Sequence, residues 1–146
     1  MRHASRRTLL FLASAVAVSS CATEKKPVAY DYDAANRMWW AGRPEEAFRM
    51  MLPLAENGNA RAQFYVGCRY IDGWGVARDE TKAVEWITKA AQGGNAEAQF
   101  NLGVFYRDGR HGKAKDPVEA RKWFELAAEQ GYGPAKPEVS PLTASP

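Results

Sequence analysis

The sequence predicts an all-α protein, a short right-handed α-solenoid built from helix-turn-helix repeats. Three observations lead to this prediction. A block of about 36 residues occurs twice in succession, which is typical of a stacked repeat array. Within each block the apolar residues recur at the spacing of one helix face. Glycine, asparagine and aspartate separate these segments at positions that suit helix ends.

The two copies of the block cover residues 60–95 and 96–133. The first part of the copy returns 36 positions later: Ala60, Ala62, Gln63, Phe64, Gly67, Tyr70 and Gly73 recur as Ala96, Ala98, Gln99, Phe100, Gly103, Tyr106 and Gly109. One extra residue in the second loop shifts the rest: Asp79, Ala83, Trp86, Ala90, Ala91 and Gly94 recur as Asp116, Ala120, Trp123, Ala127, Ala128 and Gly131. Agreement at so many positions indicates one structural unit used twice.

Each copy predicts two helices. The first helix begins after Asn59 or Asn95 and the second after Asp79 or Asp116, because Asn and Asp are favoured N-caps. In the second helices the apolar residues form a single stripe with i, i+3, i+4, i+7 and i+8 spacing. Trp86 and its counterpart in the second copy lie in this stripe, so we expect both to be buried. Between the helices, a glycine-containing loop suits positive φ angles.

Residues 30–59 are predicted to be a degenerate half repeat. Residues 44–59 align with the second helix of the following copy, but Pro53 interrupts the helical pattern, and a proline there usually kinks or breaks a helix. Residues 30–41 would supply the first helix of this unit. No glycine loop joins the two segments.

The repeated pattern resembles the Sel1-like repeat family, a relative of the tetratricopeptide repeats. The residues that carry the resemblance are A-x-A-Q-x-x-V-G-x-x-Y-x-x-G-x-G-V-x-x-D-x-x-K-A-x-x-W-x-x-K-A-A-x-x-G over residues 60–94, and it extends over roughly residues 36–133. In the second copy, residues 111–113 replace the Trp-Gly-Val of the first loop. The resemblance implies an α-solenoid that binds other proteins.

The first helix of each copy is predicted to have two distinct faces. Gln63, Val66, Gly67 and Tyr70 share one face, where the small glycine would let the partner helix approach closely. The other face corresponds to the concave surface of tetratricopeptide-like arrays, and we call it the predicted strip. It consists of Arg61, Phe64, Cys68, Ile71, Asp72, Glu97, Phe100, Val104, Arg107 and Asp108.

Two interpretations of the predicted strip remain open. In one, Phe64 and Phe100 anchor a bound peptide or helix, with charged residues around them. In the other, both rings are buried between neighbouring repeats. Cys68 is expected to be a small, partly apolar core residue and not a reactive thiol.

The N-terminal segment resembles a bacterial lipoprotein signal. Residues 1–20 combine three arginines with a short apolar run, as in a cleaved signal peptide, and small residues precede Cys21 as in a lipobox. We expect Cys21 to carry the lipid and residues 21–29 to form a tether. An ordinary signal with a chance cysteine is the alternative, and either the general or the twin-arginine export route would fit. Because Asp does not follow Cys21, the outer membrane, facing the periplasm, is favoured over the inner membrane. The proline-rich residues 134–146 are expected to be disordered.

Composition argues against several classes of function. The formal charge of +3 comes from the three arginines of the signal, and the remaining 17 basic residues balance the 17 acidic ones. A neutral chain gives no electrostatic reason to expect nucleic-acid binding. After the signal the chain has one histidine, His111, and its only serines lie in the tail, so neither a metal site nor a Ser–His–Asp arrangement is predicted. No cofactor is expected.

The sequence therefore predicts a lipid-anchored adaptor of the cell envelope, without catalysis, that binds a protein or peptide. A periplasmic inhibitor or immunity-type protein that binds a cognate toxin or hydrolase is the main alternative. An envelope enzyme acting on peptidoglycan is a weaker one. A tight one-to-one complex with an enzyme would favour the inhibitor, and activity on peptidoglycan fragments would favour the enzyme.

Overall fold

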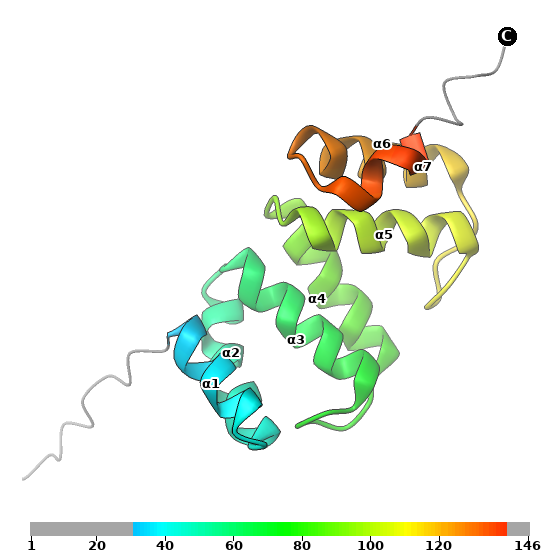
Figure 1. Cartoon of the computed structure of the whole chain (residues 1–146). Helices are drawn as coiled ribbons and strands as arrows, with labels where there is room; N and C mark the ends of the chain where they lie inside the picture. Colours follow the sequence, from blue (N-terminus) through cyan, green and yellow to red (C-terminus); the bar gives the residue numbers. More distant parts are fainter. Residues whose placement is uncertain (1–30, 140–146) are drawn as a thin grey trace, which may run out of the picture.

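The computed structural model describes residues 31–139 of the 146-residue chain, and every regular element over these residues is helical. The elements are α1 (Tyr32–Trp40), α2 (Pro44–Glu56), α3 (Ala60–Asp72), α4 (Glu80–Gln92), α5 (Ala96–Asp108), α6 (Pro117–Glu129), η1 (Gly133–Ala135) and α7 (Lys136–Val139). Successive helices pack on one another along the chain, so that three helix pairs follow each other as an α-solenoid (Figure 1). The predicted fold class is confirmed.

The helix ends agree with the sequence patterns that predicted them. The side-chain oxygen of Asn59 accepts a hydrogen bond from the backbone N–H of Ala62 at 2.9 Å, and that of Asn95 accepts one from Ala98 at 2.7 Å. The Asp79 carboxylate accepts from the backbone N–H of Lys82 at 2.9 Å. These bonds satisfy donors that the first turn of a helix otherwise leaves unpaired. In each copy the predicted caps therefore set where the helices begin.

In the second and third pairs, the second helix lies close to the first because a glycine stands at the crossing. A Cβ built on Gly67 would lie 2.6 Å from Cγ1 of Ile87, and one on Gly103 would lie 2.7 Å from Cε1 of Phe124. Both distances are far shorter than normal carbon–carbon contacts. The predicted packing face of the first helix is confirmed, and a larger residue at either glycine would require the facing Ile87 or Phe124 side chain, or the helix that carries it, to shift.

The interhelical loop of each repeat touches the preceding repeat. In the first copy, a Cβ on Gly75 would lie 2.4 Å from the backbone oxygen of Pro44, the first residue of α2. In the second copy, Nδ1 of His111 lies 3.5 Å from the carboxylate of Glu80, the first residue of α4. The two loops differ in sequence but contact equivalent positions. They join consecutive repeats in addition to the helix packing.

Residues 30–59 contain a helix pair where the sequence predicted a degenerate half repeat. Helices α1 and α2 both form, joined by three residues, and α2 continues through Pro53 to Glu56. Pro53 lies near the C-terminal end of the helix, and its carbonyl accepts the N–H of Asn57 at 3.1 Å. Only a few residues of α2 follow the proline, so the helix ends soon after the point where the proline would disturb it.

The expected disorder of residues 134–146 is wrong for residues 134–139. Gly133–Ala135 form a 3-10 turn and Lys136–Val139 a short helix, with Ala135 fully buried. A proline is compatible with the first residues of a helix, where its missing N–H would have no partner. The short helix is also held by an ion pair between Glu138 and Arg107 at 2.9 Å. Residues 140–146 lie outside the described part.

The buried apolar side chains form two clusters, one centred on α2 and α3 and the other on α4 and α5. Ile87 and Phe124 are almost completely buried, whereas the neighbouring Trp86 and Trp123 are half-buried. Each indole packs on the edge of a cluster, Trp86 on the first and Trp123 on the second. The expected burial of the two tryptophans is therefore only partial, because they lie at the margin of the apolar stripe.

Candidate protein-binding surface

The residues of the predicted strip lie on α3 and α5, in equivalent positions of consecutive repeats. None of the ten is fully buried. Arg61, Asp72, Glu97 and Asp108 are exposed, and the other six are half-buried. Four of the five charged side chains of the strip are thus exposed, and Arg107 is the exception.

The apolar side chains of the strip pack mainly within the array. Phe64 and Ile71 of α3 pack against the cluster that contains Leu102 and Phe105 of α5. The ring of Phe100 lies 5.5 Å from that of Phe124 and 5.4 Å from that of Tyr132, measured between centroids. These contacts favour the interpretation in which both phenylalanines are part of the packing between neighbouring elements. Their role as anchors for a partner stays a prediction.

At the C-terminal end of the strip, Arg107 is engaged by the protein itself. Its guanidinium hydrogen-bonds the Asp108 carboxylate at 2.8 Å and pairs with Glu138 of α7 at 2.9 Å. These two hydrogen bonds raise the pKa of Arg107 above its ordinary value. The end of α5 is therefore linked to α7.

Cys68 has the properties of a structural thiol. Its pKa is raised to about 11, chiefly by burial; Arg69 lowers the pKa in part, and the carboxylates of Asp72 and Glu97 raise it. A thiol with this pKa is almost entirely protonated at neutral pH, and the thiolate is the nucleophile and metal ligand. The side chain therefore contributes packing and not reactivity.

A second surface feature, which the sequence interpretation missed, lies between α1 and α3. We call it the aromatic–arginine cluster; it consists of Tyr32, Trp39, Arg61, Tyr65, Arg69 and Trp74. The guanidinium of Arg61 lies 4.0 Å from the ring centre of Tyr32, and that of Arg69 lies 4.2 Å from the ring of Trp39. The Trp39 ring in turn meets that of Trp74 edge-to-face, with centroids 4.2 Å apart. Cation–π and aromatic contacts thus join the first repeat to the second.

One signal in the sequence could have revealed this cluster. Arg61, Tyr65 and Arg69 are spaced i, i+4 and i+8, so they share one face of α3. Their equivalents one repeat later are Glu97, Asn101 and Phe105, which have a different chemistry. Comparing the two copies identifies the residues that recur in both. It therefore does not identify a helix face whose residues occur in one copy only.

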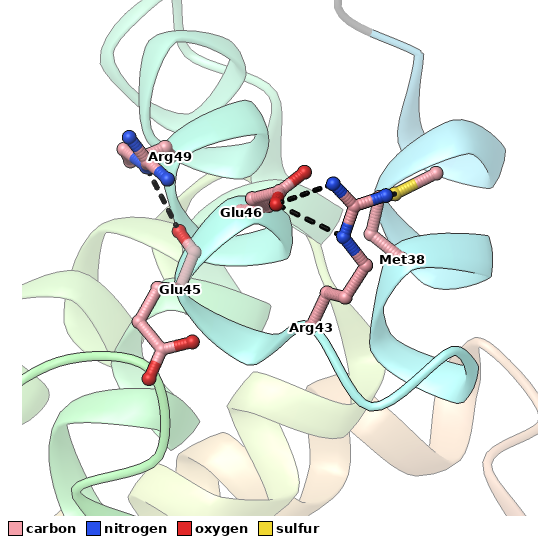
Figure 2. Close-up of polar contacts among 5 residues, drawn as sticks. All are labelled: Met38, Arg43, Glu45, Glu46 and Arg49. Carbon is pink, nitrogen blue, oxygen red and sulfur yellow. Dashed lines mark hydrogen bonds and ion pairs between the residues drawn. The ribbon is translucent and has the colours of Figure 1, made fainter.

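The tip of the first repeat carries exposed indoles. Trp40, at the end of α1, is 85% exposed, and Trp74, in the loop after α3, is 56% exposed. The charged groups beside them are paired: Arg43 bonds Glu46 at 2.6 Å and also approaches the sulfur of Met38 (Figure 2). In the same close-up, Arg49 donates to the backbone oxygen of Glu45. The tip thus combines exposed aromatic surface with an arginine, Arg43, that is paired within the protein.

Within residues 31–139, no group of three or more His, Cys, Asp or Glu side chains is arranged to hold a metal ion. None of the helices described here has the length and apolar character that crossing a membrane requires. Cys21 and the segment interpreted as its signal peptide lie outside the described residues.

Comparisons with known proteins support the relationship that the sequence pattern indicated. The Sel1 repeat family matches residues 60–95 and 96–132. A crystal structure of a Sel1 repeat protein from Oxalobacter formigenes superposes with a TM-score of 0.66 and 38% sequence identity, covering 76% of this chain and 89% of that chain. A crystal structure of a protective antigen of uropathogenic Escherichia coli, which has an SLR fold, superposes with a TM-score of 0.61 and 34% sequence identity. The match covers 68% of this chain and 22% of the antigen. No curated protein matches the chain.

Both structural relatives consist of Sel1-type repeats, and the first is covered over most of its length. Proteins of this kind typically mediate protein–protein interactions and are not typically enzymes. The chain belongs to the Sel1 repeat family.

Proposed function

We propose that this protein is a non-catalytic adaptor of the bacterial envelope that binds a protein partner through α3 and α5. The observation that supports the proposal is that exposed residues of the predicted strip recur at equivalent positions of consecutive repeats. Exposed charged residues recur one repeat apart, as Arg61 and Glu97 and as Asp72 and Asp108. An array that presents exposed charged side chains at equivalent positions of successive repeats suits an extended partner segment.

Within the strip, the charged residues are better placed for a partner than the phenylalanines. Phe64 and Phe100 already contact neighbouring elements, whereas Glu97 is exposed at the start of α5 and lies close enough to Cys68 to affect its pKa. Charged groups at the edge of an interface chiefly determine specificity and the rate of association. Glu97 is therefore the residue to change first.

The proposal includes a lipid on Cys21 that holds the array at the membrane, with the outer membrane facing the periplasm as the favoured place. Its support is the sequence around Cys21. Two or more acyl chains are needed for stable anchoring, since each buried CH₂ contributes roughly 0.8 kcal/mol. Growth with a labelled fatty acid should label the wild-type protein and not Cys21→Ser. A wild type without label would contradict the anchor.

The adaptor role is tested by cross-linking the protein to its partner in intact cells. A photoreactive residue at position 101, on the first helix of the third pair, should cross-link a defined envelope protein. Glu97→Lys should reduce this product at least about tenfold, as expected for a charge reversal in an interface. Glu129→Lys is the matched control, because Glu129 is exposed on α6, outside the strip. Equal cross-linking in both variants would place the partner elsewhere.

A further inference from the structure

We propose that the exposed tryptophans at the tip of the first repeat rest on the bilayer surface and orient the solenoid there. The exposed residues are Trp40 and Trp74; together with the half-buried Trp39, which packs against Trp74, we call them the tryptophan tip. This inference rests on the proposed lipid anchor at Cys21, and it adds a second, non-covalent contact between the protein and the membrane. The occupant of the tip is thus a lipid headgroup layer.

The tryptophan tip is an apolar surface that the described part of the chain leaves largely uncovered. Trp40 is 85% exposed and Trp74 is 56% exposed, although Trp is highly buried on average in folded proteins. The loop that carries Trp74 is fixed, because Gly75 packs against the backbone of Pro44. Trp39 supports the Trp74 ring from α1 at 4.2 Å. The Trp74 indole is therefore held in place by contacts with α1 and α2.

The chemistry of indole matches the boundary between lipid and water. Trp combines a large apolar ring with one N–H donor, and it is enriched where proteins meet the headgroup region. The turn between α1 and α2 and the loop after α3 lie at the same end of the molecule (Figure 1). A bilayer could therefore receive Trp40 and Trp74 together, without a change in the fold.

The tether allows this contact. Eleven residue steps separate Cys21 from Tyr32, the first residue of α1, and they span up to about 36 Å when extended. Helix α1 has nine residues, so Tyr32 and Trp40 lie eight rises, or about 12 Å, apart, which is less than the span of the tether. The tip therefore lies within reach of a membrane that holds the lipid on Cys21.

The charges around the tip indicate that the indoles, and not an attraction to anionic headgroups, would hold the protein on the lipid surface. Arg43 is paired with Glu46, and Arg78 is paired with Glu80 at 2.7 Å. Arg37, in the last turn of α1, is exposed and forms no ion pair with the described residues, so anionic lipid should add only a modest attraction. The contact should hold on zwitterionic phosphatidylcholine and should change little with salt.

The test uses residues 21–146, the mature chain proposed here, with Cys68→Ala so that Cys21 is its only thiol. Cys21 is coupled to a maleimide lipid in phosphatidylcholine vesicles that contain brominated acyl chains, which quench tryptophan at the interface. Three of the five tryptophans belong to the tip. We expect clear quenching in the parent protein and loss of most of it in Trp40→Ala/Trp74→Ala. Trp86→Phe, away from the tip, should keep the quenching.

Two results would overturn the proposal: no quenching in the coupled parent protein, or equal quenching in the parent and in Trp40→Ala/Trp74→Ala. Loss of the cross-linked partner in Trp40→Ala, without quenching by the vesicles, would assign the tip to a protein and overturn it as well. Circular dichroism confirms that each variant folds. Since the lipid is attached chemically, the result is independent of whether cells acylate Cys21, which the fatty-acid labelling decides separately.

Discussion

Gly103 lies directly beneath the ring of Phe124, where a Cβ would come within 2.7 Å of Cε1. Gly103→Ala should therefore destabilise the protein by about 1–3 kcal/mol, as overpacking of a core usually does. Alanine favours a helix by about 1 kcal/mol over glycine, so the observed loss will be reduced by that amount. Urea unfolding measures the difference. Adding Phe124→Leu should relieve part of the loss, whereas a more stable Gly103→Ala would show that the ring moves aside easily.

The contact between the first loop and α2 can be separated from glycine's backbone preference. Gly75 and Gly94 both have positive φ, 79° and 86°, but only a Cβ at Gly75 would meet another group, the Pro44 oxygen at 2.4 Å. Gly94→Ala should cost roughly 1–2 kcal/mol from the left-handed conformation alone. Gly75→Ala should cost clearly more and alter the fluorescence of Trp74. Equal losses would show that the loop yields without penalty.

The buried amide of Gln99 connects three helices. Its Nε2 donates to the Ala91 oxygen at the end of α4 at 3.1 Å, and its Oε1 accepts from Gln130 after α6 at 2.7 Å. Gln99→Leu removes both bonds, but Gln130 is exposed to water and Gly94 still donates to Ala91, so the free energy of unfolding should fall by about 1 kcal/mol. Gln63→Leu, which loses the equivalent bond to Ala55, is the matched comparison. A stability gain in both variants would mean that apolar packing outweighs the bond.

The cap of α4 predicts a stability change in acid. The hydrogen bond from the backbone N–H of Lys82 lowers the pKa of Asp79 below its ordinary value of 3.8. A carboxyl whose pKa is lowered on folding stabilises the folded state at any pH above its ordinary pKa. This stabilisation is lost as the pH falls through the pKa of the folded state. Asp79→Asn should therefore show a flatter decline of Tm between about pH 5 and pH 2. Glu85→Gln, on the same helix but away from the cap, should keep the wild-type slope.

Cys68 should resist alkylation in the native protein. With a pKa of about 11 in place of 9.0, the thiolate fraction at pH 8 is about 100-fold lower than in the unfolded chain. In a Cys21→Ala variant, iodoacetamide should therefore react at least that much more slowly with the folded protein than with the urea-unfolded one. The rate should still be rising with pH at pH 10. A fast native reaction would show an activated thiol.

The sequence was sufficient for the parts of the fold that the two copies share. Asn59, Asn95 and the helix-crossing glycines act locally, through one hydrogen bond or one missing Cβ, and so their spacing alone predicted helix starts and close packing. The fully buried side chains of the second helices also lie within the predicted stripe.

The features that were missed depend on contacts specific to one place in the array. Phe100 meets Tyr132 because the chain after α6 turns back over α5, and no periodicity encodes this turn. The prolines after Gly133 suggested disorder, yet Glu138 and the buried Ala135 hold that segment in place. The rings of Trp39 and Trp74 come from different repeats, so their pairing required the positions of both.

The loop contacts at Pro44 and Glu80 have a consequence for how the protein unfolds. In a linear array, the coupling between neighbours decides whether the units melt together or fray one by one. Each loop here leans on the start of a helix in the preceding repeat, so loosening one repeat also removes support from the one before it. Such coupling should make the three helix pairs unfold as a single cooperative unit, and we expect amide hydrogens of α2 and α4 to exchange at similar rates.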